Sequence, residues 1–246
     1  GAAGRRRRGD LRAKHGTKSM HTFKIQGPSP MCGGITVSDT KGQGFFDERE
    51  TRHADLLLQG KLLEGSTMEQ ENYRYWFTLG QIGFFVKTSI HTSPHVVVLV
   101  FDASLRSVQK MAEGKGSNAQ LQCYRQVVGR AQEQGLEVFI ALTHLDRLEN
   151  ERNPDSQKRI GESVLDQVME FRRKLSSALT TTDRRSVVCS MPEENIFVIE
   201  NYRQDKYDQD PSIDLAALEL LESLVNAADQ YVGENCPEIA QRCIAF

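Results

Sequence analysis

The sequence has no marked excess of either charge, no long apolar run and no cysteine pattern that would hold a metal. It contains 31 Lys and Arg against 33 Asp and Glu, a balance that argues against general binding to nucleic acid. No apolar run approaches the ~20 residues that cross a bilayer, so we expect no membrane span. The cysteines are odd in number and scattered, which favours reduced thiols in the cytoplasm over a disulfide framework. They are Cys32, Cys123, Cys189, Cys236 and Cys243.

The 246 residues are enough for one α/β domain with a full core. Residues 1–15, which include the run Arg5 to Arg8, show no apolar periodicity, so we predict a disordered arm or a fragment edge. A nucleic-acid-binding arm is the less favoured alternative, since a short basic run is usually solvated. The first residue is Gly1, so the lack of a targeting segment says little. We expect the domain over residues 16–232 and a C-terminal tail over residues 233–246.

Five apolar runs predict buried strands. The two in the middle of the chain are continuous rather than alternating, which is typical of strands covered on both faces. The predicted strands are His21 to Gln26, Gly34 to Ser38, His95 to Asp102, Leu136 to Thr143 and Asn195 to Glu200.

Helical patterns separate the later strands. One face of the last helix would carry Leu218, Leu221, Val225 and Ala228, and Asp210 followed by Pro211 would begin it. Two earlier helices are predicted around residues 121–131 and 160–179. Strands alternating with helices predict an α/β fold with a doubly wound, mostly parallel sheet and right-handed crossovers.

The strand that ends at Ser38 is followed by Asp39-Thr40-Lys41-Gly42. A carboxylate at a strand end can hold the water shell of Mg²⁺, and a glycine three residues later lets a backbone N–H approach a terminal phosphate. Gln43 follows where small GTPases orient the attacking water, which makes it a candidate catalytic residue. Ordinary turn chemistry and chance remain the alternatives for this segment.

Two later strand ends also carry polar motifs. Thr143-His144-Leu145-Asp146 follows the strand ending at Leu142, and Glu200-Asn201-Tyr202 follows the strand ending at Ile199. A carboxylate at Asp146 would accept both N1–H and the exocyclic amine of guanine, a pattern that adenine does not offer. The usual guanine motif is Asn/Thr-Lys-x-Asp, so Thr143 and Asp146 fit, whereas His144 departs from it. A polar turn after a strand remains the alternative.

These motifs arrive in the order found in P-loop GTPases, and four segments resemble the interferon-induced protein 44 family. The segments are His95 to Leu105, Val138 to Asp146, Asn195 to Tyr202 and Leu215 to Val232. The resemblance covers roughly His15 to Val232, and that family also tends to carry His in place of the motif lysine. It implies a cytosolic GTP/GDP-binding domain linked to innate antiviral responses.

The resemblance implies a set of site residues. By this resemblance, Gly42, Thr143, Asp146 and Asn201 would bind the nucleotide. Mg²⁺ would be held by Thr17, with Thr22 as the alternative, and by Asp39 through water.

The resemblance also has a gap. A G-x-x-x-x-G-K-[ST] loop is expected upstream of Gly16, and Gly1 and Gly4 are instead followed by four arginines. We therefore expect a G-domain-like fold that is truncated at its N-terminus, with poor nucleotide binding and at most slow GTP hydrolysis. The rival hypothesis is a degenerate domain that acts as a nucleotide-independent interaction module. An unrelated doubly wound enzyme is a third, for which the six histidines offer no nucleophile–base set. The protein partner is not predicted, and a homodimer is an open alternative.

Overall fold

The computed structural model describes residues 20–25, 34–40, 48–61, 92–115, 118–144, 160–181, 189–200 and 211–237. The chain divides into two compact units. One contains the hairpin of β1 (His21–Ile25) and β2 (Ile35–Asp39), and the other contains all the remaining described elements.

The first two strands pair antiparallel, with His21 opposite Asp39 and Ile25 opposite Ile35. Both strands were predicted, but as buried strands of a mostly parallel sheet; they form an antiparallel hairpin instead, and most of their described residues are exposed, so the prediction of burial is wrong for this pair. Only residues 26–34 join them, and a parallel crossover needs about a dozen residues or more. Phe23 and Val37 are register partners, and both are exposed.

The second unit is built on a parallel sheet of order β3-β4-β5. Its strands are β3 (Val96–Asp102), β4 (Glu137–Thr143) and β5 (Ile196–Val198). Helices α3 (Arg106–Ala112) and α4 (Asn118–Glu133) connect the first two strands, and α6 (Ile160–Leu179) precedes the third. The predicted α/β class with a parallel sheet is confirmed for this unit.

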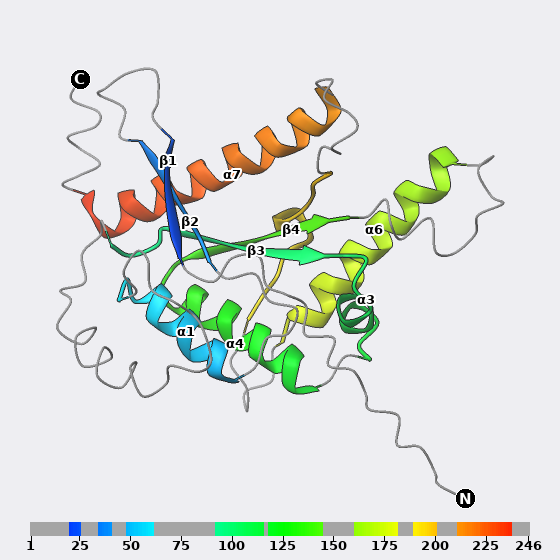
Figure 1. Cartoon of the computed structure of the whole chain (residues 1–246), viewed down its shortest axis with the longest axis horizontal. Coiled ribbons are helices and arrows are strands. Elements are labelled where there is room, and N and C mark those ends of the chain that lie inside the picture. Colours follow the sequence, from blue (N-terminus) through cyan, green and yellow to red (C-terminus); the bar gives the residue numbers. More distant parts are fainter. Residues whose placement is uncertain are drawn as a thin grey trace, which may run out of the picture. The chain divides into compact units, whose positions relative to one another are not determined.

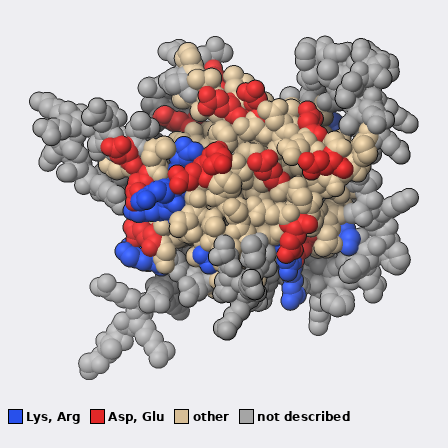
Figure 2. Space-filling model, turned by 180° about the vertical axis from the view of Figure 1, so that it is seen from behind, with Lys and Arg blue, Asp and Glu red and all other residues tan. Residues whose placement is uncertain are grey.

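The sheet of the second unit has helices on both faces (Figure 1). Helices α1 (Glu48–Leu58), α3, α4 and α6 lie on one side, and α7 (Pro211–Asn235) lies on the other. The largest core cluster joins α3, α4 and α6 to the side chains that β3, β4 and β5 direct toward them. An ion pair between Asp55 of α1 and Arg130 of α4 adds a polar link between these two helices. Figure 2 shows side chains of both charge signs on the face seen from behind.

The two continuous apolar strands differ in how well they are covered. In β4 every residue from Val138 to Thr143 is buried, as predicted for a strand between two others. In β3 only Phe101 is buried, and Val100 is 67% exposed, so the prediction of cover on both faces is wrong for β3. Among the described strands β3 pairs only with β4, which leaves it at an edge of the sheet.

Helix α7 begins at Pro211, as predicted, and continues to Asn235, three residues past the predicted end of the domain. Its predicted apolar face is not the one that packs most closely. Ala227 is buried and Tyr231 packs against the core, whereas Leu218 is 59% exposed. No helix in the described part of the chain has both the length and the apolar character needed to cross a membrane.

Three described cysteines are free thiols: Cys123 and Cys189 are buried, and Cys236 is partly exposed. Burial raises the pKa of the Cys189 thiol, and its Sγ donates a hydrogen bond to the carbonyl oxygen of Leu179 at 2.8 Å. A buried thiol with a raised pKa is a poor nucleophile, so Cys189 acts as a core residue.

Helices α1, α3 and α4 each end in a left-handed glycine, at Gly60, Gly114 and Gly135. In each case the glycine N–H bonds the carbonyl three residues back, and the next N–H bonds the carbonyl five residues back. This is the Schellman motif, which satisfies the last helical carbonyls and favours glycine because the φ angle is positive.

Gly60→Ala should lower the free energy of unfolding by about 3 kcal/mol, because strain and a clash act together. A Cβ at Gly60 would lie 2.8 Å from the carbonyl oxygen of Thr92 and 2.9 Å from the backbone nitrogen of Ser93. Gly114→Ala is the matched control, since its φ is +69° and nothing lies within 4 Å of its Cβ; we expect about 1 kcal/mol from the left-handed backbone alone. Urea denaturation of both variants measures the difference, and equal losses would contradict the tight packing around Gly60.

Candidate functional site at the carboxyl edge of the sheet

Of the candidate residues, Thr143 and Asp39 lie in the described part of the chain, as does the alternative Thr22. Thr17, Gly42, Gln43, Asp146 and Asn201 lie outside the described residues. Asp39 and Thr143 belong to different units.

Asp39 is the last residue of β2 and is exposed. It stands opposite His21 in the hairpin register, and Thr22 stands opposite Ser38. Within the described ranges no group of three or more His, Cys, Asp or Glu residues could hold a metal ion. The part of the predicted Mg²⁺ site that is described thus amounts to one exposed carboxylate at a strand end.

Four polar residues meet at the carboxyl ends of β3 and β4, where an open parallel sheet places its ligands. We call them the edge cluster, and they are Asp102, Ser104, Thr143 and His144. The register aligns Asp102 with Thr143, so the two strands end side by side. The N–H of Ala103 bonds the carbonyl oxygen of Thr143 at 2.9 Å, which carries the pairing one residue past the strands.

Asp102 organises the turn that follows β3. Its Oδ1 accepts hydrogen bonds from the backbone N–H of Ser104 at 2.9 Å and from the Ser104 hydroxyl at 2.6 Å. An aspartate that bonds the backbone two residues ahead forms a turn of its own, so the chain leaves the sheet in a fixed direction. The amide of Gln109, in α3, donates to the carbonyl oxygens of Ala103 and Ser104 at 3.3 and 3.2 Å and fixes the same turn from the helix side.

His144 turns the chain out of β4 in a left-handed conformation, with φ at +60°. It is the one described residue other than glycine with a positive φ. Such backbones cost on the order of 1 kcal/mol and often occur at functional sites. The polar contacts of its ring with neighbouring residues hold this conformation in place.

The ring contacts of His144 also indicate its proton arrangement. Its Nδ1 lies 3.0 Å from Oγ1 of Thr143 and 3.7 Å from Oδ2 of Asp102. The Thr143 hydroxyl donates to the carbonyl oxygen of Phe101 at 3.3 Å, so its oxygen accepts from the ring. Nδ1 therefore carries the proton, and in the neutral imidazole Nε2 keeps a lone pair and accepts. A lysine at this position could only donate, so His144 changes the chemistry of the motif.

The end of β5 joins the same edge. The N–H of Ile199 bonds the carbonyl oxygen of Leu142 at 2.8 Å, so the chain beyond β5 runs beside the end of β4. Glu200 follows and is exposed. The polar segments after β3, β4 and β5 thus leave the sheet from one edge, as the parallel topology requires.

Thr143 was predicted from the sequence as a site residue, whereas Asp102, Ser104 and Gln109 were not. A signal was present, because Asp-x-Ser directly after a buried strand is typical of a turn closed by the aspartate side chain. The positive φ of His144 had only a weak signal: histidine is enriched among residues with a positive φ, but few histidines adopt one.

Comparisons of the chain with protein-family models, with curated proteins and with solved structures find no match.

Proposed function

We propose that this chain binds a guanine nucleotide, with the base held at the carboxyl edge of the β3-β4-β5 sheet. The observation that carries the proposal is the left-handed turn at His144, which ends β4 at the carboxyl edge of the sheet, two residues before Asp146 in the sequence. The edge cluster fixes the start of this turn through Thr143 and Asp102. Asp146 would accept two guanine protons, and Asn201 would approach from the segment after β5.

Hydrolysis of GTP is not needed for this proposal. Its candidate residues, Gly42 and Gln43, lie outside the described residues, and Asp39 is an exposed carboxylate in the other unit. The described residues do not bring together a ligand set for Mg²⁺. We therefore derive no catalytic step, and the cytosolic, innate-immune setting is proposed from the sequence resemblance alone.

The second candidate function is a nucleotide-independent interaction module. One observation favours it: Asp102 and Thr143 are already engaged in hydrogen bonds with their own neighbours. In this reading the edge cluster serves to close the turns after β3 and β4.

A titration of the ¹⁵N-labelled chain with GDP and, separately, with ADP distinguishes the two functions. GDP should bind weakly and shift the amide resonances of Ala103, Thr143 and His144, because these groups lie at the turn after β4 where the guanine base is proposed to bind. ADP should bind at least about tenfold more weakly, since adenine presents no paired donors to a carboxylate. Equal responses to both nucleotides would refute guanine recognition. The absence of any response in a folded chain would favour the interaction module.

A further inference from the structure

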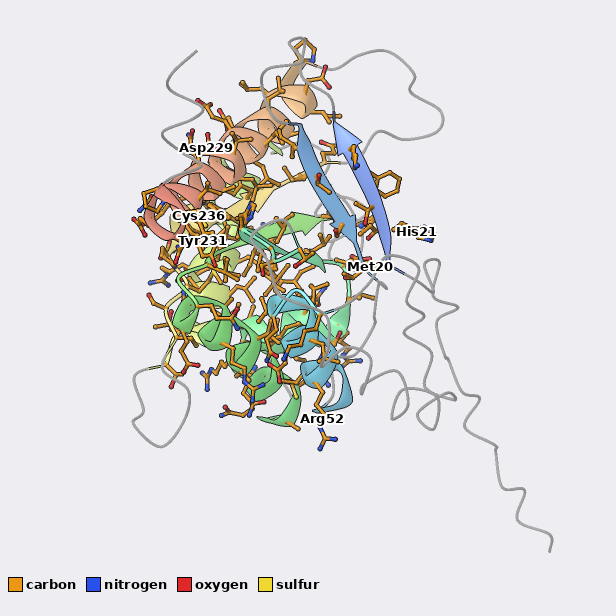
Figure 3. All side chains as sticks on the ribbon, turned by 90° about the vertical axis from the view of Figure 1, so that its left-hand side faces the viewer. Met20, His21, Arg52, Asp229, Tyr231 and Cys236 are labelled. Carbon is orange, nitrogen blue, oxygen red and sulfur yellow. The ribbon has the colours of Figure 1, made fainter. Side chains whose placement is uncertain are left out.

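Helix α7 carries a second apolar stripe besides the one that packs on the sheet. The inner stripe consists of Ala227, which is buried, and Tyr231, which packs against the core of the sheet. The ring of Tyr231 stacks on His95, with centroids 5.8 Å apart, and Figure 3 places Tyr231 on the side of α7 nearer the sheet. The other stripe, here called the outer stripe, consists of Leu218, Leu221, Val225, Ala228 and Val232.

The outer stripe is only partly covered within this chain. Leu218 is 59% exposed and the neighbouring Leu215 is 57% exposed. The other members of the stripe are partly exposed, and none is buried. Single exposed leucines are common on protein surfaces, but a continuous stripe along more than three turns of one helix marks a surface for interaction.

The spacing of the outer stripe specifies what would cover it. Its members follow one another at intervals of three and four residues, which is the a/d repeat of a left-handed coiled coil. With Leu218 at a, the e positions are Glu222 and Asp229, and both are exposed. Of the g positions, Tyr231 belongs to the inner stripe, Leu224 is partly exposed and Ala217 is exposed. A second helix could therefore pack along the outer stripe, and its flanking contacts would be with acidic side chains.

Charge decides between the helices that could occupy this surface. Helix α7 contains five acidic residues and no basic residue. In an antiparallel pair of two copies, Glu222 and Asp229 would face the same acids of the other copy. In a parallel pair they would face Ala217 and Leu224 of the other copy, which offer them no basic partner. Neither arrangement with a second copy is favourable, and an anionic membrane surface would repel the same acids.

We propose that α7 docks a basic amphipathic helix of a partner protein, which packs leucine-type side chains against the outer stripe and places Lys or Arg beside Glu222 and Asp229. The outer stripe lies beside the inner stripe on α7 and contains no residue of the edge cluster, so it could be occupied whether or not nucleotide is bound. The proposal therefore does not depend on the proposed function.

The test uses the full chain and a designed peptide of about three heptads, with Leu at a and d and Lys at e and g. The comparison peptide carries Glu in place of every Lys. Calorimetry should detect binding of the Lys peptide, at least about tenfold tighter than the Glu peptide, and the affinity should fall as salt is added. If neither peptide binds, or both bind equally, the proposal is overturned.

Three variants of α7 locate the binding surface. Leu218→Ser should weaken binding of the Lys peptide about tenfold, because it removes an apolar contact with the peptide. Since Leu218 is exposed in the free chain, the substitution should not destabilise the fold. The double variant Glu222→Lys and Asp229→Lys should bind the Glu peptide better than the Lys peptide. Glu219→Lys is the matched control, since Glu219 is exposed at a b position away from the a and d positions, and it should leave the preference for the Lys peptide unchanged.

Circular dichroism verifies that each variant is folded, and sedimentation of the wild type should show a monomer. Self-association abolished by Leu218→Ser would assign the outer stripe to a second copy instead.

Discussion

Replacing Ile140 by alanine should lower the free energy of unfolding by about 3–4 kcal/mol, the largest stability effect expected from one substitution in the sheet. Ile140 lies in the middle of β4, is fully buried, and is paired with Leu99 on one side and Ile196 on the other. Helices cover both faces of the sheet, so the space left by the lost methyl and ethyl groups cannot fill easily. The resulting cavity adds to the loss of apolar burial.

The matched control is Val100→Thr, on the neighbouring strand. Val100 is 67% exposed, and threonine keeps the β-branched shape that suits a strand. We expect a change within about 0.5 kcal/mol. Urea denaturation followed by circular dichroism measures both variants. A loss at Val100 comparable to that at Ile140 would mean that β3 is covered in solution.

The second large effect concerns Asp146. Asp146→Ala should weaken binding of GDP roughly a hundredfold, because a charge-assisted bidentate contact contributes on the order of 2–3 kcal/mol. Binding of ADP should hardly change, since adenine does not use this carboxylate. Displacement of a fluorescent guanine nucleotide by unlabelled GDP or ADP would measure both affinities in wild type and variant.

Glu133→Ala is the control for the change of charge. Glu133 is exposed at the end of α4, close to where β4 begins, so it lies at the opposite edge of the sheet from the proposed site. The two substitutions remove the same charge, and only the one at Asp146 should lower affinity for GDP. Equal losses would point to an effect of net charge and would remove Asp146 from the site.

The strands of the parallel sheet were predictable because their apolar runs are compact and bounded by polar residues. The predicted start of β3 was His95 and the observed start is Val96; for β4 they are Leu136 and Glu137. β5 is shorter than predicted because its pairing with β4 stops at Val198. Strand pairing was harder to predict, because an apolar run does not show which strand lies beside it. The short connection makes β1 and β2 antiparallel, and Val100 is exposed because β3 lies at an edge of the described sheet.

The candidate site was predictable only in part. The strand end at Thr143 follows from the apolar run before it, and the structure places this residue buried beside Asp102. The turn at His144 depends on contacts with two strands, which a local pattern does not encode. The packing face of α7 was predicted wrongly for a similar reason. Two apolar stripes run along this helix, and periodicity alone does not show which of them packs on the sheet.

The register of the parallel sheet has a consequence for how the protein folds. Val96 pairs with Glu137, so the β3-β4 ladder joins positions roughly 40 residues apart; Ile140 pairs with Ile196, so the β4-β5 ladder joins positions roughly 55 residues apart. No hydrogen bond between the strands of this parallel sheet can form until a long loop has closed, which slows folding of the unit that contains it. During synthesis β3 and β4 can pair early, but β4 has no neighbour on its other side until Val198 emerges. Helix α7 is the last described element, so the apolar side chains that it covers on the sheet stay open to the chaperones and proteases of the cell until α7 itself has been made.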